Sequence, residues 1–423
     1  MRIVLGALAL AGLLPSLALA SPAGEQLPDL LYAGEARAQR ALLESDCAAD
    51  HADACFGLGL VDLITSVEDL SRAFYRHGAV SPGLPAAAMF LGIDGGVPAG
   101  PANPDPEPLT YEGLRQIFED FVAGLDRARE SFQAAGDAGD FTISLDPLRV
   151  RFDIDGDGAV GEGETLAALL ADAIALESPD EPPPGRKTKD KSPSPELLIG
   201  FDRADAVWFA GYAQVSAAPV DFLLAHDFSE FFAAALHRVF PEAGLPMSEH
   251  MRGGMVMMDA ESDAFIGDLL AAFHTADFPV TDAERFKGVL ARLQAITALS
   301  RQNWSLILAE TDDNRELVPS PRQTSIFPGQ TVTQEVVDAW LAALDSFDRI
   351  LAGELLIPHW RFKEGFDLKA FFETATETDL VMLFAGYGAL PYIKPGPIAS
   401  AGDFAEANAV FGDNWPVFAL WFN

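Results

Sequence analysis

Carboxylate side chains recur at short, regular spacing between residues 153 and 164. The segment reads Asp-Ile-Asp-Gly-Asp-Gly-Ala-Val-Gly-Glu-Gly-Glu, which places Asp153, Asp155 and Asp157 at alternate positions and Glu164 at its end. Carboxylates this close repel one another unless a cation neutralises them. A hard cation such as Ca²⁺ binds through about six to eight oxygen atoms, which carboxylates can supply. The spacing therefore predicts a cation site within one loop.

The same segment matches the EF-hand calcium loop. Gly158 stands at the position of the sharp turn, where glycine adopts left-handed backbone angles at low cost. In this motif Ala159 contributes its backbone carbonyl, Gly161 acts through a water molecule and Glu164 binds with both oxygens. The predicted metal ligands are Asp153, Asp155, Asp157, Ala159, Gly161 and Glu164. The alternative interpretation is an acidic surface turn without an ion.

The flanks of the loop differ from those of a standard EF-hand. Leu166, Leu169 and Ile174 form an apolar stripe for an exiting helix, whereas Pro147 and alternating apolar residues precede the loop and disfavour an entering helix. No second loop matches as well. A calcium sensor opens a pair of helices on binding, so this unpaired loop predicts a structural ion, with a regulatory ion as the alternative.

The first residues have the pattern of a secretory signal peptide. Residues 1–20 contain Arg2, an apolar stretch and the small-x-small sequence Ala18-Leu19-Ala20 before Ser21. We expect cleavage after Ala20 and a periplasmic or secreted protein. No later stretch is long and apolar enough to span a bilayer.

The chain has only two cysteines, Cys47 and Cys55, which lie close together in the sequence. In an oxidising compartment such a pair favours a disulfide. The alternative, a metal pair, lacks the further Cys or His cluster that would complete a tetrahedral site. We therefore predict a structural disulfide between Cys47 and Cys55.

Composition narrows the class of partner. Apolar residues make up 49% of the 423 residues, enough for a folded core. Acidic residues number 63 against 28 basic residues, which gives a net charge of −35. Such a surface disfavours binding to nucleic acids and to anionic membranes, because both require a basic face. No protein partner follows from the sequence.

Apolar residues recur mostly at helical spacing, so we predict a mainly α protein, either a multi-helix bundle or an irregular helical array. Stripes start after Thr110, Thr281 and Thr331, and the last two have the spacing of a capping box. Further helices are expected over 29–45, 163–176, 203–225, 228–240, 260–274 and 367–375, and short strands over 149–154 and 380–384. The predicted organisation is a signal peptide (1–20), an N-terminal helical region (21–177), a flexible Pro/Lys-rich linker (178–196) and a C-terminal helical region (197–423).

Three weaker groups of residues have both functional and structural interpretations. His226, Glu230 and His237 have a spacing that suits a metal or a proton-transfer pair, but ordinary surface and cap positions explain it better. Five methionines beside His250 suit a soft metal such as Cu(I), but gap-filling core residues explain them better. These methionines are Met247, Met251, Met255, Met257 and Met258. His359-Trp360-Arg361 suits a carboxylate or sugar site, or a loop that anchors Trp360 in the core.

Several stretches resemble a family of exported bacterial proteins of unknown function that carry a single EF-hand loop. They are Gly200-Phe201-Asp202-Arg203-Ala204-Asp205, His226-Asp227, Leu356 to Phe362, and Gly365-Phe366-Asp367-Leu368. The resemblance implies export and calcium binding, and it implies no activity. The predicted function is thus an exported Ca²⁺-binding protein with a binding or scaffold role. The alternatives are a cell-envelope enzyme of all-α fold, for example a glycan-degrading one, and a soft-metal binder.

Overall fold

A computed structural model describes most of the chain. The described residues are 21–80, 102–153, 155–161, 164–169, 197–313, 315–326 and 331–412. The protein is mainly helical, with 62% helix and few short strands, which confirms the predicted class. The predicted signal peptide and the predicted linker lie outside the described residues.

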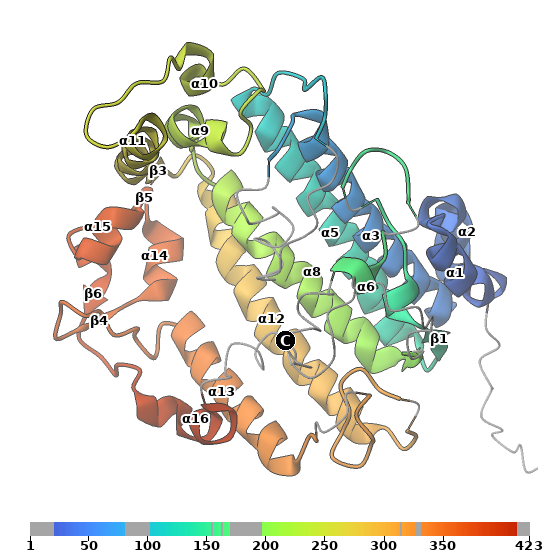
Figure 1. Cartoon of the computed structure of the whole chain (residues 1–423). Helices are drawn as coiled ribbons and strands as arrows, with labels where there is room; N and C mark the ends of the chain where they lie inside the picture. Colours follow the sequence, from blue (N-terminus) through green and yellow to red (C-terminus); the bar gives the residue numbers. More distant parts are fainter. Residues whose placement is uncertain are drawn as a thin grey trace, which may run out of the picture.

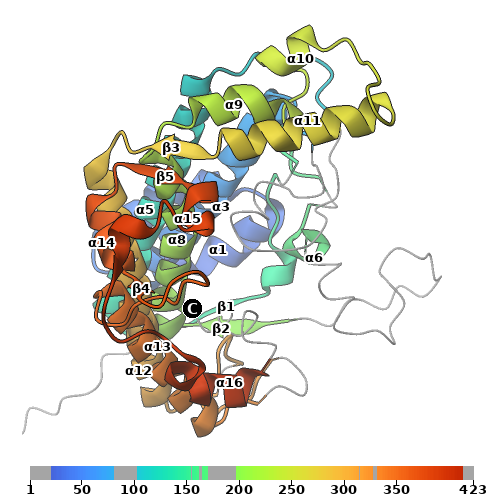
Figure 2. The same ribbon diagram turned by 90° about the vertical axis from the view of Figure 1, so that its left-hand side faces the viewer.

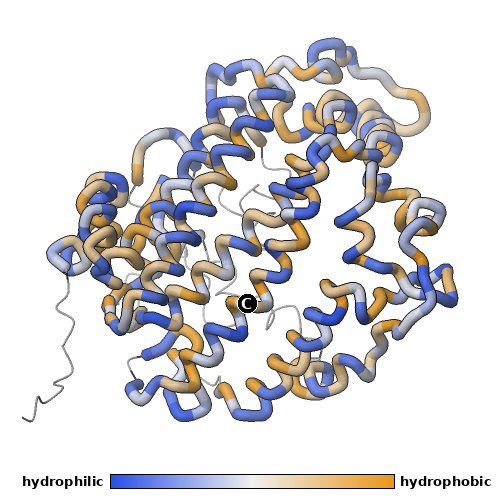
Figure 3. Tube along the Cα trace, turned by 180° about the vertical axis from the view of Figure 1, so that it is seen from behind, coloured by the Kyte–Doolittle hydropathy of each residue, from blue (hydrophilic) through white to orange (hydrophobic). Residues whose placement is uncertain are grey.

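Four long helices run side by side and form the centre of the molecule (Figure 1). They are α3 (Ala52–Arg76), α5 (Tyr111–Ala138), α8 (Arg203–Leu224) and α12 (Ala283–Ala309). Helix α8 packs against both α5 and α12. Its buried alanines include Ala206, Ala210 and Ala217. Because their side chains are small, the axes of the neighbouring helices can lie close to that of α8. The tube in Figure 3 shows polar and apolar residues alternating along these helices, as expected where one face is buried.

Residues before and after the predicted linker share one core. Phe56 of α3, Phe132 of α5 and Phe209 of α8 pack together, with ring centroids 5.7 Å apart for Phe56 and Phe132 and 5.2 Å apart for Phe132 and Phe209. A two-stranded antiparallel sheet adds to this core, since β1 (Ile143–Leu145) pairs with β2 (Ile199–Phe201). The N-terminal and C-terminal regions are therefore packed against each other.

The N-terminal helices cover the outside of α3. The predicted helix over 29–45 is divided into α1 (Pro22–Ala33), a 3-10 turn η1 (Ala36–Gln39) and α2 (Arg40–Cys47). The break falls at Gly34, whose φ of 75° ends α1 in the left-handed region. The predicted disulfide is confirmed: Cys47 at the end of α2 is bonded to Cys55 in the first turns of α3, with 4.5 Å between their Cα atoms.

The C-terminal elements surround one side and one end of the long helices (Figure 2). They comprise α9 (Ser229–Ala235), η3 (Leu236–Arg238), α10 (Pro246–His250), α11 (Ala260–His274), α13 (Gln334–Leu351), α14 (Leu368–Thr374), α15 (Leu380–Ala385), η4 (Leu390–Tyr392), η5 (Ala401–Phe404) and α16 (Ala405–Phe411). In Figure 2, α9, α10 and α11 lie at the top and α13 and α16 lie near the bottom. Strand β3 (Asp277–Pro279) pairs with β5 (Glu377–Asp379), and β4 (Gly365–Phe366) pairs with β6 (Ile393–Lys394). Trp304 of α12 and Trp340 of α13 are buried in one hydrophobic cluster where the two helices meet.

Three local predictions were wrong. Asp282 and Thr333 cap α12 and α13, because their side chains accept hydrogen bonds from Arg285 N and Val336 N, and Thr281 and Thr331 do not serve as the caps. The segment 380–384 is helical rather than extended, since the Asp379 carboxylate caps the start of α15.

None of the described helices is long and apolar enough to cross a membrane.

Candidate metal centre

The predicted calcium loop brings three of its carboxylates together. Asp153, Asp155 and Glu164 each offer one oxygen, and these oxygens lie within 4.8 Å of one another. The Asp157 side chain does not belong to this group, and its Oδ1 accepts a hydrogen bond from Ala159 N at 2.8 Å. Such a group of oxygens suits a hard cation.

The first ligand position, Asp153, is fully buried and held from three directions. Its Oδ1 accepts a hydrogen bond from Gly156 N at 2.7 Å, and its Oδ2 accepts one from Gly158 N at 2.9 Å and one from Arg72 Nε at 2.6 Å. The two glycines have φ values of 79° and 93°, which only glycine adopts readily. The chain therefore curls around the Asp153 carboxylate.

Glu164 closes the other end of the loop. Its two carboxylate oxygens accept hydrogen bonds from Asp155 N and Gly161 N. The backbone reinforces this closure, since Leu166 N donates to Val150 O at 3.0 Å. Burial raises the pKa of Asp155, and the nearby charges of Glu164, Asp157 and Asp153 raise it further. A bound cation would relieve that repulsion.

The loop is attached to α3 and α1. On α3, Glu68 Oε1 accepts a hydrogen bond from Asp153 N at 3.1 Å, and a Cβ atom added at Gly156 would lie 2.3 Å from Ser71 O. At the end of α1, a Cβ at Gly34 would lie 2.6 Å from Val160. These contacts leave no room for side chains at the two glycines, so the loop is seated directly on both helices.

The elements before and after the loop agree with the predicted departure from a standard EF-hand. The element before it is a 3-10 turn, η2 (Pro147–Arg149), followed by extended residues, as Pro147 leads one to expect. The element after it is α6 (Leu166–Leu169), and the rest of the predicted exiting helix lies outside the described residues.

A second acidic cluster was not predicted from the sequence. Oxygens of Asp202, Glu310 and Glu316 lie within 4.8 Å of one another, although Asp202 is more than 100 residues from the segment that holds the two glutamates. Burial raises the pKa of Glu310 to about 8, with further contributions from Asp202 and Glu316. Burial likewise raises the pKa of Asp202 to about 6. At neutral pH this cluster therefore holds at least one proton.

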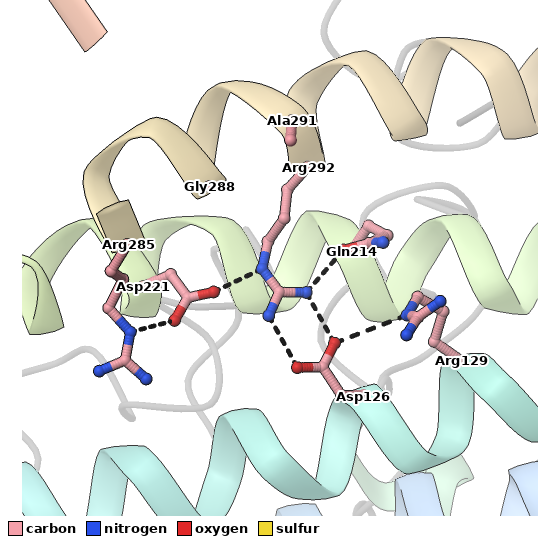
Figure 4. A pocket seen from close by; sticks show the side chains of 8 residues that line it. All are labelled: Asp126, Arg129, Gln214, Asp221, Arg285, Gly288, Ala291 and Arg292. Atoms are coloured by element: carbon pink, nitrogen blue, oxygen red, sulfur yellow. Dashed lines mark hydrogen bonds and ion pairs between the residues drawn. The ribbon is translucent and has the colours of Figure 1, made fainter. Parts of the chain in front are cut away.

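A surface hollow of about 430 Å³ lies where α5, α8 and α12 meet (Figure 4). Arg292 of α12 joins the three helices, since its guanidinium donates to both oxygens of Asp126 on α5 at 2.7 and 2.8 Å and to Asp221 and Gln214 on α8. Arg285 also bridges from α12 to Asp221, at 2.9 Å. Burial alone would raise the pKa of Asp126, but Arg292 and Arg129 outweigh it and lower that pKa. These ion pairs and hydrogen bonds link α5, α8 and α12.

The structure does not bring the predicted His226 group together. His226 is 1% exposed, and its ring nitrogens contact Phe222 O at 2.6 Å and Thr378 Oγ1 at 2.8 Å, whereas Glu230 is exposed. His237 is also buried and contacts Asp268 at 3.3 Å. Both histidines are core residues, so their interpretation as surface and cap positions was wrong.

Two expectations of buried side chains were also wrong. The five methionines lie at the surface, with exposed fractions from 42% for Met247 to 73% for Met255 and Met257. The exposed fraction of Trp360 is 68%, and its indole nitrogen donates to Phe384 O at 2.8 Å. His359 and Arg361 contact the neighbouring carbonyls of Leu383 and Ala385, so these three side chains cap the end of α15.

Comparisons with known proteins give no relative: no family model, no curated protein and no solved structure matches the chain.

Proposed function

We propose that this protein binds Ca²⁺ through residues 153–164 and that the ion has a structural role. The observation that carries the proposal is the convergence of Asp153, Asp155 and Glu164 oxygens within 4.8 Å in a loop of matching sequence. Asp157, the Ala159 carbonyl and a water at Gly161 would complete the oxygen shell, as in the EF-hand motif.

Electrostatics supports a divalent ion over an empty acidic turn. The loop carries the carboxylates of Asp153, Asp155, Asp157 and Glu164, and the ion pair at 2.6 Å from Arg72 supplies a single positive charge to Asp153. Since like charges at this spacing oppose folding, a divalent cation stabilises the folded loop.

The way in which the loop is attached supports a structural role. A sensor needs helices that are free to open on binding, but this loop is seated on α3 through Glu68 and Arg72 and on α1 through Gly34. The ion would therefore fasten α1, α3 and the loop into one unit. We also propose that the protein is exported, which the pattern at residues 1–20 and the Cys47–Cys55 disulfide support.

The proposal is tested by thermal unfolding and titration calorimetry with and without calcium. We expect calcium to raise the melting temperature of the native protein and to have no such effect on Glu164→Gln, which loses one charge and the bidentate ligand. At a calcium concentration a hundredfold above Kd the gain is about 2.7 kcal/mol. Glu112→Gln, an exposed acid on α5, is the matched control and should respond like the native protein. Equal responses in all three proteins, or none, would refute the assignment.

A further inference from the structure

Ser21, the residue after the predicted cleavage point, is buried and held on α3. Its exposed fraction is 1%, its backbone nitrogen lies 2.6 Å from Oδ2 of Asp53, and its hydroxyl donates to the same oxygen at 2.9 Å. Residues at the ends of a domain are usually exposed and poorly ordered unless they are tied down. Ser21 is therefore in an environment built to fix it.

Asp53 has no cationic partner among the described side chains. It is 6% exposed, and within the described part of the chain no Lys, Arg or His forms an ion pair with it, so its bonds come from the Ser21 amide and hydroxyl. A buried carboxylate is costly unless a positive charge compensates it. The position that could supply such a charge is the Ser21 nitrogen itself.

We propose that cleavage between Ala20 and Ser21 creates a buried ion pair between the new α-ammonium group and Asp53. Hydrolysis of this peptide bond consumes one water molecule, leaves a carboxylate on Ala20, and leaves an amine on Ser21 that takes up a proton from solvent. A free α-amine is largely protonated at neutral pH. Removal of the leader thus turns a neutral amide donor into the missing cation at a distance that already suits an ion pair.

One local feature opposes an ammonium at this position and another accommodates its carboxylate partner. Ser21 is the N-cap of α1, where the positive end of the helix dipole disfavours a further positive charge, so an ammonium there needs the Asp53 carboxylate beside it. Gly24 in the first turn allows the carboxylate to approach, because a Cβ atom at that position would lie 2.1 Å from Asp53 Oδ2. The beginning of α1 is thus shaped around a carboxylate that faces the Ser21 nitrogen.

The first test is the mass of the exported protein. We expect the mature chain to begin at Ser21. A mature chain that begins at any other residue would overturn the proposal, because its amine would not lie at Asp53.

The second test is a cycle of four proteins with two N-termini and two residues at position 53. One N-terminus is Ser21, and the other retains Ala20 as a single added residue; each is made with Asp53 and with Asp53→Asn. We expect the added residue to lower the melting temperature by about 5 °C when Asp53 is present and to have little effect in Asp53→Asn. Asp29→Asn, which removes an exposed carboxylate from α1, the helix that Ser21 caps, should keep the full effect of the added residue. An equal effect of the added residue with Asp53 and with Asp53→Asn would contradict the ion pair.

A third measurement remains decisive if Asp53→Asn fails to fold. In the protein that begins at Ser21, acetic anhydride should modify the α-amine much more slowly than it modifies the α-amine of the form that retains Ala20. Equal rates of modification would show that the Ser21 amine is not held in a buried ion pair and would overturn the proposal.

Discussion

Arg72 offers the sharpest test of how the loop and the ion interact. Its guanidinium is the cationic group that contacts Asp153, the fully buried first ligand of the proposed site, at 2.6 Å. Replacement by methionine keeps the aliphatic volume and removes the charge. In the absence of calcium, the remaining donors to the buried Asp153 carboxylate among the described residues are then neutral backbone amides.

The size of the effect follows from burial. Removing one partner of a fully buried ion pair costs about 3–5 kcal/mol. Arg72 is 28% exposed, so solvent already shares its charge, and we expect a loss of about 2–3 kcal/mol without calcium. Saturating calcium supplies a positive charge beside the same carboxylate, and the loss should fall to about half of that value.

The assay is urea unfolding of native and Arg72→Met proteins in chelator and in excess calcium. Arg40→Met is the control, since Arg40 pairs with Glu44 and with the buried Asp62 on α3, and neither acid is a proposed ligand or a residue that holds the loop. Its deficit should be the same in both conditions. A deficit of Arg72→Met that calcium leaves unchanged would show that the ion does not bind beside Asp153.

Two further predictions concern other parts of the fold. Because the pKa of Glu310 in the folded protein is about 8, above its ordinary value of 4.5, the folded state binds a proton that the unfolded state releases. The stability that this proton provides is present below pH 4.5 and is lost as the pH rises through 8, so urea unfolding at pH 6 and pH 9 should show a decline that Glu310→Gln reduces. An equal decline in the variant would contradict this origin. Replacing Cys47 and Cys55 together by alanine should lower the free energy of unfolding by about 2–3 kcal/mol, because the bond closes only a short loop. A denaturation midpoint unchanged by the double substitution would exclude such a stabilising role.

Sequence patterns predicted the parts of the fold that depend on local periodicity. The helices over 203–225, 260–274 and 367–375 correspond to α8, α11 and α14 within about one residue at each end, since each has an aspartate cap and an apolar face. The break at Gly34 was missed because the apolar spacing continues across it, and only the positive φ reveals the turn.

The candidate site was predictable to a similar extent and for a similar reason. Asp153, Asp155 and Glu164 lie within one short loop, so their spacing alone predicted that their carboxylates converge, whereas the Asp157 side chain stands outside the group. Arg72, Glu68 and the acidic cluster around Glu310 come from distant segments, and no local pattern links them. The exposure of single side chains was predicted least well. His226 is in the core and Trp360 is at the surface, because tertiary packing decides the exposure of a single side chain.

The exposed methionines affect how the protein tolerates oxidants. Met255, Met257 and Met258 lie in a surface loop whose backbone is held by the Asp263 carboxylate, which accepts hydrogen bonds from three successive amides. Conversion of a buried methionine to the sulfoxide places a polar oxygen in the core, whereas at these positions the new oxygen meets water. Such exposed thioethers can consume an oxidant before it reaches the core, and the enzymes that reduce methionine sulfoxide can reach them for repair.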